Sequence, residues 1–153
     1  MKKVFNEKNG AMFTVDYDKK RITFVQSYMG SKVVGRADCK EDTFDVSFGM
    51  ALAYAKAELS IRESEFTRAT DYYYNLVDIS FDSYAGERSY RLANEMQRIV
   101  RGEIKKQSHY LSNQQRLVKF LQSLDSKRAD SILFFGKDNY HDVLKTAFNM
   151  VKK

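Results

Sequence analysis

The residue types that most often carry catalysis are scarce in this chain and lie far apart in sequence. His109 and His141 are the only histidines, and Cys39 is the only cysteine. Neither histidine falls in a metal-binding motif such as HExxH. We interpret Cys39 as a small apolar residue at the end of a strand, and an enzyme that uses Cys39 or His141 is the alternative. The sequence therefore predicts a protein without enzymatic activity.

Acidic side chains cluster once, ahead of the first expected helix. Glu41, Asp42 and Asp45 could hold a metal ion, but carboxylates in a turn before a helix more often cap its free N–H groups. The tripeptide Gly-Ser-Lys at residues 30–32 lacks the second glycine and the strand-to-helix context of a phosphate-binding loop. We therefore expect neither a metal nor a cofactor.

A basic surface is the best-defined pattern in the sequence. At roughly 100° per residue, one side of a helix expected from about Ser83 to Gln107 gathers Leu92, Met96, Ile99 and Val100. Four cations fall almost opposite, within an arc of about 80°, and we call them the basic ridge: Arg91, Arg98, Arg101 and Lys105. Such a ridge could follow phosphates, meet an acidic protein surface or form an ordinary solvated face.

Tyrosines cluster before and inside the same helix, at Tyr72, Tyr73, Tyr74, Tyr84 and Tyr90. Tyrosine is favoured at interfaces because it contributes a large contact area at a small cost in conformational entropy. It also stacks on single-stranded bases where cations are interleaved, and it often forms the half-buried rim of a core. The predicted partner-binding residues are the basic ridge, with Tyr84 and Tyr90 as aromatic anchors.

The first forty residues are typical of an antiparallel β-meander. Alternating apolar residues and short polar turns predict strands at Lys3–Asn6, Met12–Tyr17, Arg21–Tyr28 and Ser31–Cys39. Gly30 can adopt the positive φ that a tight turn requires.

The rest of the chain favours helices. Ala-rich residues from Val46 to about Thr67 predict a long helix that covers the apolar face of the meander. Residues 71–82 stay undecided between a continued helix, a break and an edge strand. After the helix that carries the basic ridge, helices are expected over Ser112–Leu124, Ser126–Phe135 and Asp138–Val151. The predicted fold is α+β: an N-terminal antiparallel β-meander packed on a long helix (1–80), followed by a helical C-terminal part (81–153), as one continuous fold.

Composition and charge limit the class of protein. The chain has 153 residues and a net charge of +6, of which +5 lies in residues 77–153, an excess that attracts anionic partners. Its 43% hydrophobic content predicts a packed core. No apolar run approaches the ~20 residues that cross a bilayer, and a single cysteine fits a reducing cytosol. We expect a cytoplasmic globular protein that does not associate with membranes.

Three features occur together between residues 12 and 57. A strand at Lys32–Cys39 ends in the cysteine, a D-x-F-D connector follows at Asp42–Asp45, and Gly49 precedes the Ala-rich helix. With the early strand residues 14–15 and 22–24, this stretch resembles a small module that is frequent among accessory proteins of phages of low-GC Gram-positive bacteria. In this pattern Gly49 is expected to let the helix approach the sheet closely.

The resemblance implies a mobile genetic element that acts in the cytoplasm of a bacterial host. Small phage proteins of this kind are similar to anti-CRISPR proteins, which block a CRISPR effector nuclease. The implied function is a non-enzymatic inhibitor that binds a host CRISPR effector nuclease or its guide-RNA complex through a protein or ribonucleoprotein surface. The alternative is a nucleic-acid-binding phage accessory protein that uses the basic ridge on DNA or RNA phosphates. The sequence leaves the oligomeric state open.

Overall fold

The structure is a computed structural model that describes residues 1–38, 46–80, 86–126 and 139–151. The chain forms two compact units. Unit 1 comprises Met1–Ile61 with Asn113–Lys153, and unit 2 comprises Arg62–Ser112. The boundary near residue 80, between the part with the meander and its helix (1–80) and the helical C-terminal part (81–153), stays a prediction.

Unit 1 begins with a four-stranded antiparallel sheet of order β1-β2-β3-β4. Its strands are β1 (Lys2–Asn6), β2 (Met12–Asp16), β3 (Arg21–Tyr28) and β4 (Ser31–Asp38), and a short 3₁₀ turn, η1 (Lys8–Gly10), follows β1. Tyr28 pairs with Ser31 across a two-residue turn in which Met29 and Gly30 both have positive φ. This geometry matches the twist of a β-hairpin. The predicted meander is confirmed.

Three helices follow the sheet in the described residues: α1 (Val46–Ser80), α2 (Gly86–Ser126) and α4 (Tyr140–Val151). Residues 71–80 of the undecided segment are helical, because α1 continues without a break to Ser80; residues 81 and 82 lie outside the described part of the chain. The expectation of a separate helix beginning at Ser112 is wrong, since α2 runs through that residue. No proline or glycine between Gly102 and Ser126 interrupts it. The helix expected over Ser126–Phe135 lies largely outside the described residues.

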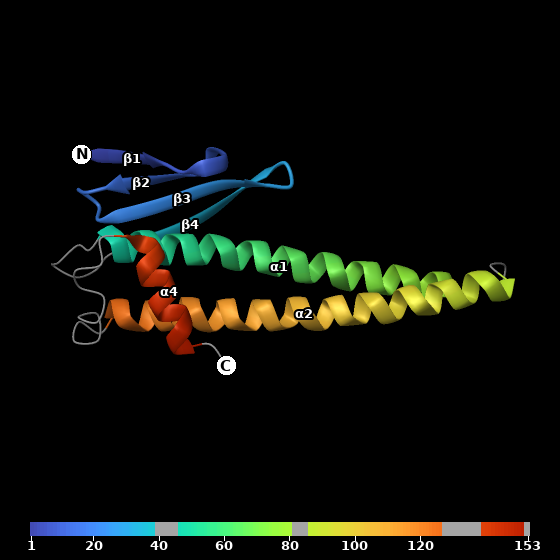
Figure 1. Cartoon of the computed structure of the whole chain (residues 1–153). Helices are drawn as coiled ribbons and strands as arrows, with labels where there is room; N and C mark the ends of the chain where they lie inside the picture. Colours follow the sequence, from blue (N-terminus) through green and yellow to red (C-terminus); the bar gives the residue numbers. More distant parts are fainter. Residues whose placement is uncertain (39–45, 81–85, 127–138, 152–153) are drawn as a thin grey trace. The chain divides into compact units, whose positions relative to one another are not determined.

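Helix α1 covers one face of the sheet (Figure 1), and two glycines permit close contact there. A Cβ atom placed on Gly35 would lie 1.9 Å from the carbonyl oxygen of Ala53 and 2.8 Å from the amide nitrogen of Ala57. A Cβ atom on Gly49 would lie 2.5 Å from Cδ1 of Ile22. The expected close approach at Gly49 is confirmed, and Gly35 adds a contact between backbones. The α+β fold with a long helix on the sheet is confirmed.

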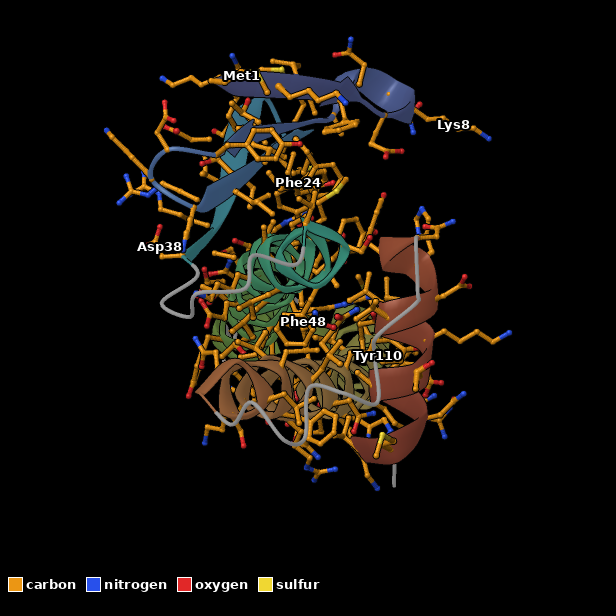
Figure 2. The ribbon with its side chains drawn as sticks, turned by 90° about the vertical axis from the view of Figure 1, so that its left-hand side faces the viewer. Met1, Lys8, Phe24, Asp38, Phe48 and Tyr110 are labelled. Atoms are coloured by element: carbon orange, nitrogen blue, oxygen red, sulfur yellow. The ribbon has the colours of Figure 1, made fainter. Side chains whose placement is uncertain are left out.

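The main hydrophobic core lies in unit 1 and has two layers. Between the sheet and α1, aromatic rings pack at centroid distances of 4.5 Å for Phe13–Phe24 and 5.1 Å for Phe24–Tyr54, and Figure 2 shows Phe24 on the side of the sheet that faces α1. On the other side of α1, the last turns of α2 and helix α4 contribute Leu121 and Val143, both fully buried. Because both sides of α1 are covered, its small residues are buried nearly all round: Ala51, Ala53, Ala55 and Ala57.

Helix α4 is held in unit 1 by its first residue. The Tyr140 ring lies 4.8 Å from the Phe13 ring and 5.8 Å from the Tyr54 ring. Burial raises the pKa of the Tyr140 phenol above its ordinary value, and the adjacent Glu7 carboxylate, which accepts its hydrogen bond, raises it further. The phenol is therefore neutral and links α4 to the start of η1.

Candidate partner-binding surface

Unit 2 pairs the last part of α1 with the first part of α2. On α2, the residues that are not fully exposed between positions 94 and 111 recur at alternating steps of three and four: Gln97, Val100, Ile104, Gln107 and Leu111. On α1, Phe66, Ala69, Tyr73 and Leu76 show the same spacing. Alternation of three and four is the heptad pattern of coiled-coil packing. We call these nine residues the seam.

Polar contacts hold the seam in register. The Gln97 side-chain amide is buried and donates a hydrogen bond of 3.0 Å to the carbonyl oxygen of Leu76. The Arg101 guanidinium donates from Nε and Nη2 to the Tyr73 hydroxyl oxygen, at 3.1 and 3.0 Å. A buried polar group that is satisfied by one specific partner restricts the pairing more than it stabilises it. The seam is therefore specific but weakly apolar.

The basic ridge keeps its place on α2, and its members differ in their surroundings. Arg91, Arg98, Arg101 and Lys105 are all exposed. Arg98 forms an ion pair with Glu95 on the same helix. Arg101 is bound to Tyr73 and so also has a structural role. The ridge therefore presents cations to solvent, with Arg101 at the edge of the seam.

The structure does not describe the side chains of the two predicted aromatic anchors. Tyr84 and the side chain of Tyr90 lie outside the described part of the structure. Of the other tyrosines in the cluster, Tyr73 is half-buried against Arg101, whereas Tyr72 and Tyr74 are exposed. Tyr110, which the sequence did not single out, has Arg62 and Lys106 over its ring at 5.0 and 5.8 Å.

In unit 2, the apolar side predicted for this helix is not the side of α2 that is buried. Leu92, Met96 and Ile99 have exposed fractions of 62%, 43% and 64%. Val100 alone of that apolar group belongs to the seam. The three exposed residues follow steps of four and three, so they form one continuous line along the helix. We call them the apolar stripe. Exposed stripes of this kind mark interaction sites in soluble proteins.

The described part of unit 2 buries few apolar side chains and exposes many. Among its described residues, Leu76 is the only buried apolar side chain, and Gln97 is buried beside it. The large apolar side chains that are exposed in unit 2 are Tyr72, Tyr74, Leu92, Met96, Ile99 and Tyr110. A helical pair with so small a core gains little stability from its own packing. Its described surface is therefore better suited to contact than to solvation.

The polar seam leads to a stability prediction at Gln107. Its Oε1 atom is buried without a hydrogen-bond partner, while its Nε2 donates to Glu103 at 2.8 Å. Gln107→Leu removes an unsatisfied acceptor, and we expect the free energy of unfolding to rise by about 1 kcal/mol. Urea unfolding monitored by circular dichroism measures the change. The same substitution at exposed Gln115 is the control and should have a much smaller effect; equal effects at both positions would contradict this account.

The residues considered for catalysis are not assembled into a site where they are described. His109 and His141 are exposed. Cys39, Glu41, Asp42 and Asp45 lie outside the described residues. Among the described residues, no group of three or more His, Cys, Asp or Glu side chains is arranged to hold a metal ion. Nor, in that part of the chain, does any helix have the length and apolar character that a membrane-spanning segment needs.

Comparisons of the chain with protein-family models, with curated proteins and with solved structures find no match in any of the three.

Proposed function

We propose that this chain is a non-enzymatic binding protein that presents unit 2 to a protein or ribonucleoprotein surface. The single observation that carries the proposal is the exposure of apolar side chains in unit 2. Its described part buries one apolar residue and exposes six large ones. Unit 1 contains the main hydrophobic core, and unit 2 carries most of the exposed large apolar side chains of the described helices. Stability and binding are thereby assigned to different parts of the chain.

The proposed partner is a bacterial CRISPR effector nuclease or its complex with guide RNA. The sequence pattern in residues 12–57 supports this choice, because it resembles modules of phage accessory proteins. The cations of the basic ridge suit a surface that carries carboxylates or RNA phosphates. Binding of the intact chain would then inhibit the nuclease by occupying a surface it needs.

A second candidate is a nucleic-acid-binding accessory protein, which the exposed ridge residues Arg91, Arg98 and Lys105 favour. Salt separates the two candidates. Binding to phosphates weakens log-linearly with salt, with a slope near one per neutralised phosphate. A contact that buries Leu, Met and Ile side chains depends on salt much less, because apolar burial releases no counterions.

We expect a ridge variant to lose inhibitory activity. The variant combines Arg91→Glu, Arg98→Glu and Lys105→Glu and leaves Arg101 intact because it bonds Tyr73. The assay measures target-plasmid cleavage by CRISPR effector complexes from low-GC Gram-positive bacteria. We expect the concentration for half-inhibition to rise by about tenfold or more, which corresponds to the loss of one or two strong contacts.

The matched control reverses three exposed lysines of unit 1, Lys19, Lys32 and Lys145, and should inhibit like the natural chain. A pull-down from bacterial lysate, with and without nuclease digestion, accompanies the assay. Recovery of effector protein after digestion supports the inhibitor. Failure to inhibit any effector, together with loss of every partner on digestion, would contradict it and leave the nucleic-acid candidate.

A further inference from the structure

The sheet of unit 1 has an outer face, on the side away from the face that contacts α1 through Gly35. Side chains alternate between the two faces along each strand, and the strand register arranges the outer ones in rows across the sheet. Two rows form the middle of the outer face: Val4, Thr14, Thr23 and Arg36, then Asn6, Met12, Val25 and Val34. Val4, Met12 and Val34 have exposed fractions of 54%, 38% and 50%. The outer face is therefore open and partly apolar.

A row of alternating charges crosses one end of the outer face. Each strand contributes one residue, and in the order β1 to β4 they are Lys2, Asp16, Arg21 and Asp38. Nε of Arg21 lies 2.6 Å from Oδ1 of Asp38. Hydrogen bonds from the backbone N–H groups of Lys19 and Asp18 hold the pKa of Asp16 below its ordinary value, so this carboxyl group is charged at neutral pH. We call the four residues of this row the charge ladder.

The charge ladder is complementary to itself under a two-fold rotation. Consider two sheets packed outer face to outer face, with a two-fold axis between them that runs parallel to the strands. This axis keeps each row in place and reverses the strand order, so β1 of one copy lies opposite β4 of the other and β2 lies opposite β3. Lys2 of each copy then meets Asp38 of the other. Asp16 likewise meets Arg21, so every charge of the ladder faces an opposite charge.

The same rotation brings apolar side chains together. Met12 of each copy lies opposite Val25 of the other, and threonines of the two central strands lie opposite each other. Val4 lies opposite Arg36, whose methylene groups can pack on an apolar side chain while the guanidinium stays in water. Packed sheets lie about 10 Å apart with their strands within about 30° of each other, a spacing that long side chains cross. The middle rows therefore suit a β-sandwich.

The charge order selects a second copy over other occupants. An anionic lipid surface or a nucleic acid would meet the carboxylates of Asp16 and Asp38. The described strands place no aromatic side chain on the outer face, so bases have nothing to stack on. A sheet of another protein would need the reverse order of charges, which a second copy supplies by symmetry. The net charge of +6 opposes self-association, but salt screens it beyond about 8 Å under physiological conditions.

We propose that two copies of this chain form a two-fold symmetric dimer through the outer face of the sheet in unit 1. The charge ladder holds one end of the contact, and Met12 and Val25 fill its middle. The face is about 20 Å wide, because its four strands lie about 4.8 Å apart. An interface of this size belongs to the smaller class, so the expected Kd is micromolar. The dimer uses no residue of unit 2 and is independent of the proposed binding function.

Charge reversal tests the predicted pairing in the full chain, and sedimentation equilibrium measures the dimer Kd. Lys2→Glu places carboxylates opposite Asp38, and Asp38→Lys places ammonium groups opposite Lys2. We expect each variant alone to raise the dimer Kd by about tenfold or more, because like charges replace opposite charges at two symmetric places. An equimolar mixture of the two variants restores opposite charges at both places. The mixture should therefore form a heterodimer with a Kd near that of the natural chain.

A second variant tests the apolar rows. Met12→Glu places a carboxylate opposite Val25 and should raise the dimer Kd by about tenfold or more. Met150→Glu makes the same substitution at an exposed position of α4, and this matched control should dimerise as the natural chain does. Circular dichroism melting checks that the variants keep their fold. Recovery of dimer in the mixture of charge variants also shows that both of them are folded.

Three outcomes would overturn the inference. The first is a natural chain that is still monomeric at about 1 mM, far above the expected Kd. The second is a dimer that neither Lys2→Glu nor Met12→Glu weakens. The third is a mixture of the charge variants that dimerises no better than its components. A dimer that Ile99→Glu dissociates and Met12→Glu does not would assign self-association to the apolar stripe of unit 2.

Discussion

Gly35→Ala is expected to lower the free energy of unfolding by about 3 kcal/mol, at the upper end of the usual cost of overpacking. The added methyl group would lie 1.9 Å from the carbonyl oxygen of Ala53 and would also approach the amide nitrogen of Ala57. Both neighbours are backbone atoms of α1, so no side chain can rotate away. The helix must move off β4, which loosens the core between the sheet and α1. Urea unfolding followed by far-ultraviolet circular dichroism measures the change in the free energy of unfolding.

The same substitution at Gly102 is the matched control and has the opposite expected sign. Gly102 is an exposed residue within α2, and a Cβ atom there has nothing within 4 Å. Alanine is favoured over glycine inside a helix, so Gly102→Ala should raise stability by roughly 0.5–1 kcal/mol. Equal effects at the two glycines would show that α1 does not approach β4 as closely as the structure has it.

Tyr140→Ala is expected to destabilise the chain by about 3–5 kcal/mol, the usual cost of deleting a buried aromatic side chain. The ring is 6% exposed and packs between the Phe13 and Tyr54 rings, so its removal leaves a cavity where α4 meets the sheet. Thermal unfolding of the variant measures the change. We also expect faster amide exchange in α4, because it loses its anchor at the first residue.

Tyr140→Phe separates packing from hydrogen bonding at the same position. It keeps the ring and removes only the hydroxyl group that donates to Glu7, so the expected loss is about 1 kcal/mol. A loss as large as that of Tyr140→Ala would mean that the hydrogen bond, and not the aromatic packing, holds α4.

The sheet was predictable because its signals are local. Strand residues alternate between buried and exposed sides, and Gly30 marks the hairpin turn between β3 and β4. The close approach at Gly49 also followed from sequence, since a glycine at the start of an Ala-rich helix suggests contact with a neighbouring element. Gly35 was harder to predict, because only the pairing of β4 with α1 shows which atoms would collide.

The continuity of α2 could not be predicted from capping signals alone. Ser112 followed by Gln115 resembles a capping box, and caps are recognised by residues that also occur inside helices. Helices commonly end at a Pro or at a Gly with positive φ. Residues 103–126 contain neither. The absence of a stop signal was therefore the better guide.

The basic ridge was predictable and the apolar stripe was not. Charges on a helix surface follow directly from spacing, but which side a neighbour covers is decided by tertiary packing. The covered side of α2 in unit 2 includes Gln97 and Gln107, whereas Leu92, Met96 and Ile99 are exposed. The distribution of apolar residues along the sequence therefore indicates the wrong side of the helix. The apolar residues Val100, Ile104 and Leu111, separated by four and seven positions, were the available signal. This signal was weak because glutamines occupy two of the five seam positions on α2.

The most direct measurement of the central claim is photo-crosslinking inside bacteria that express the partner. A benzophenone amino acid replaces Ile99 in one variant and Val34, which is comparably exposed on the sheet, in another. We expect a protein adduct at position 99 that survives nuclease digestion, because Ile99 is exposed in unit 2. Adducts with another protein at position 34 alone, or a position-99 adduct that disappears with nucleic acid, would contradict it.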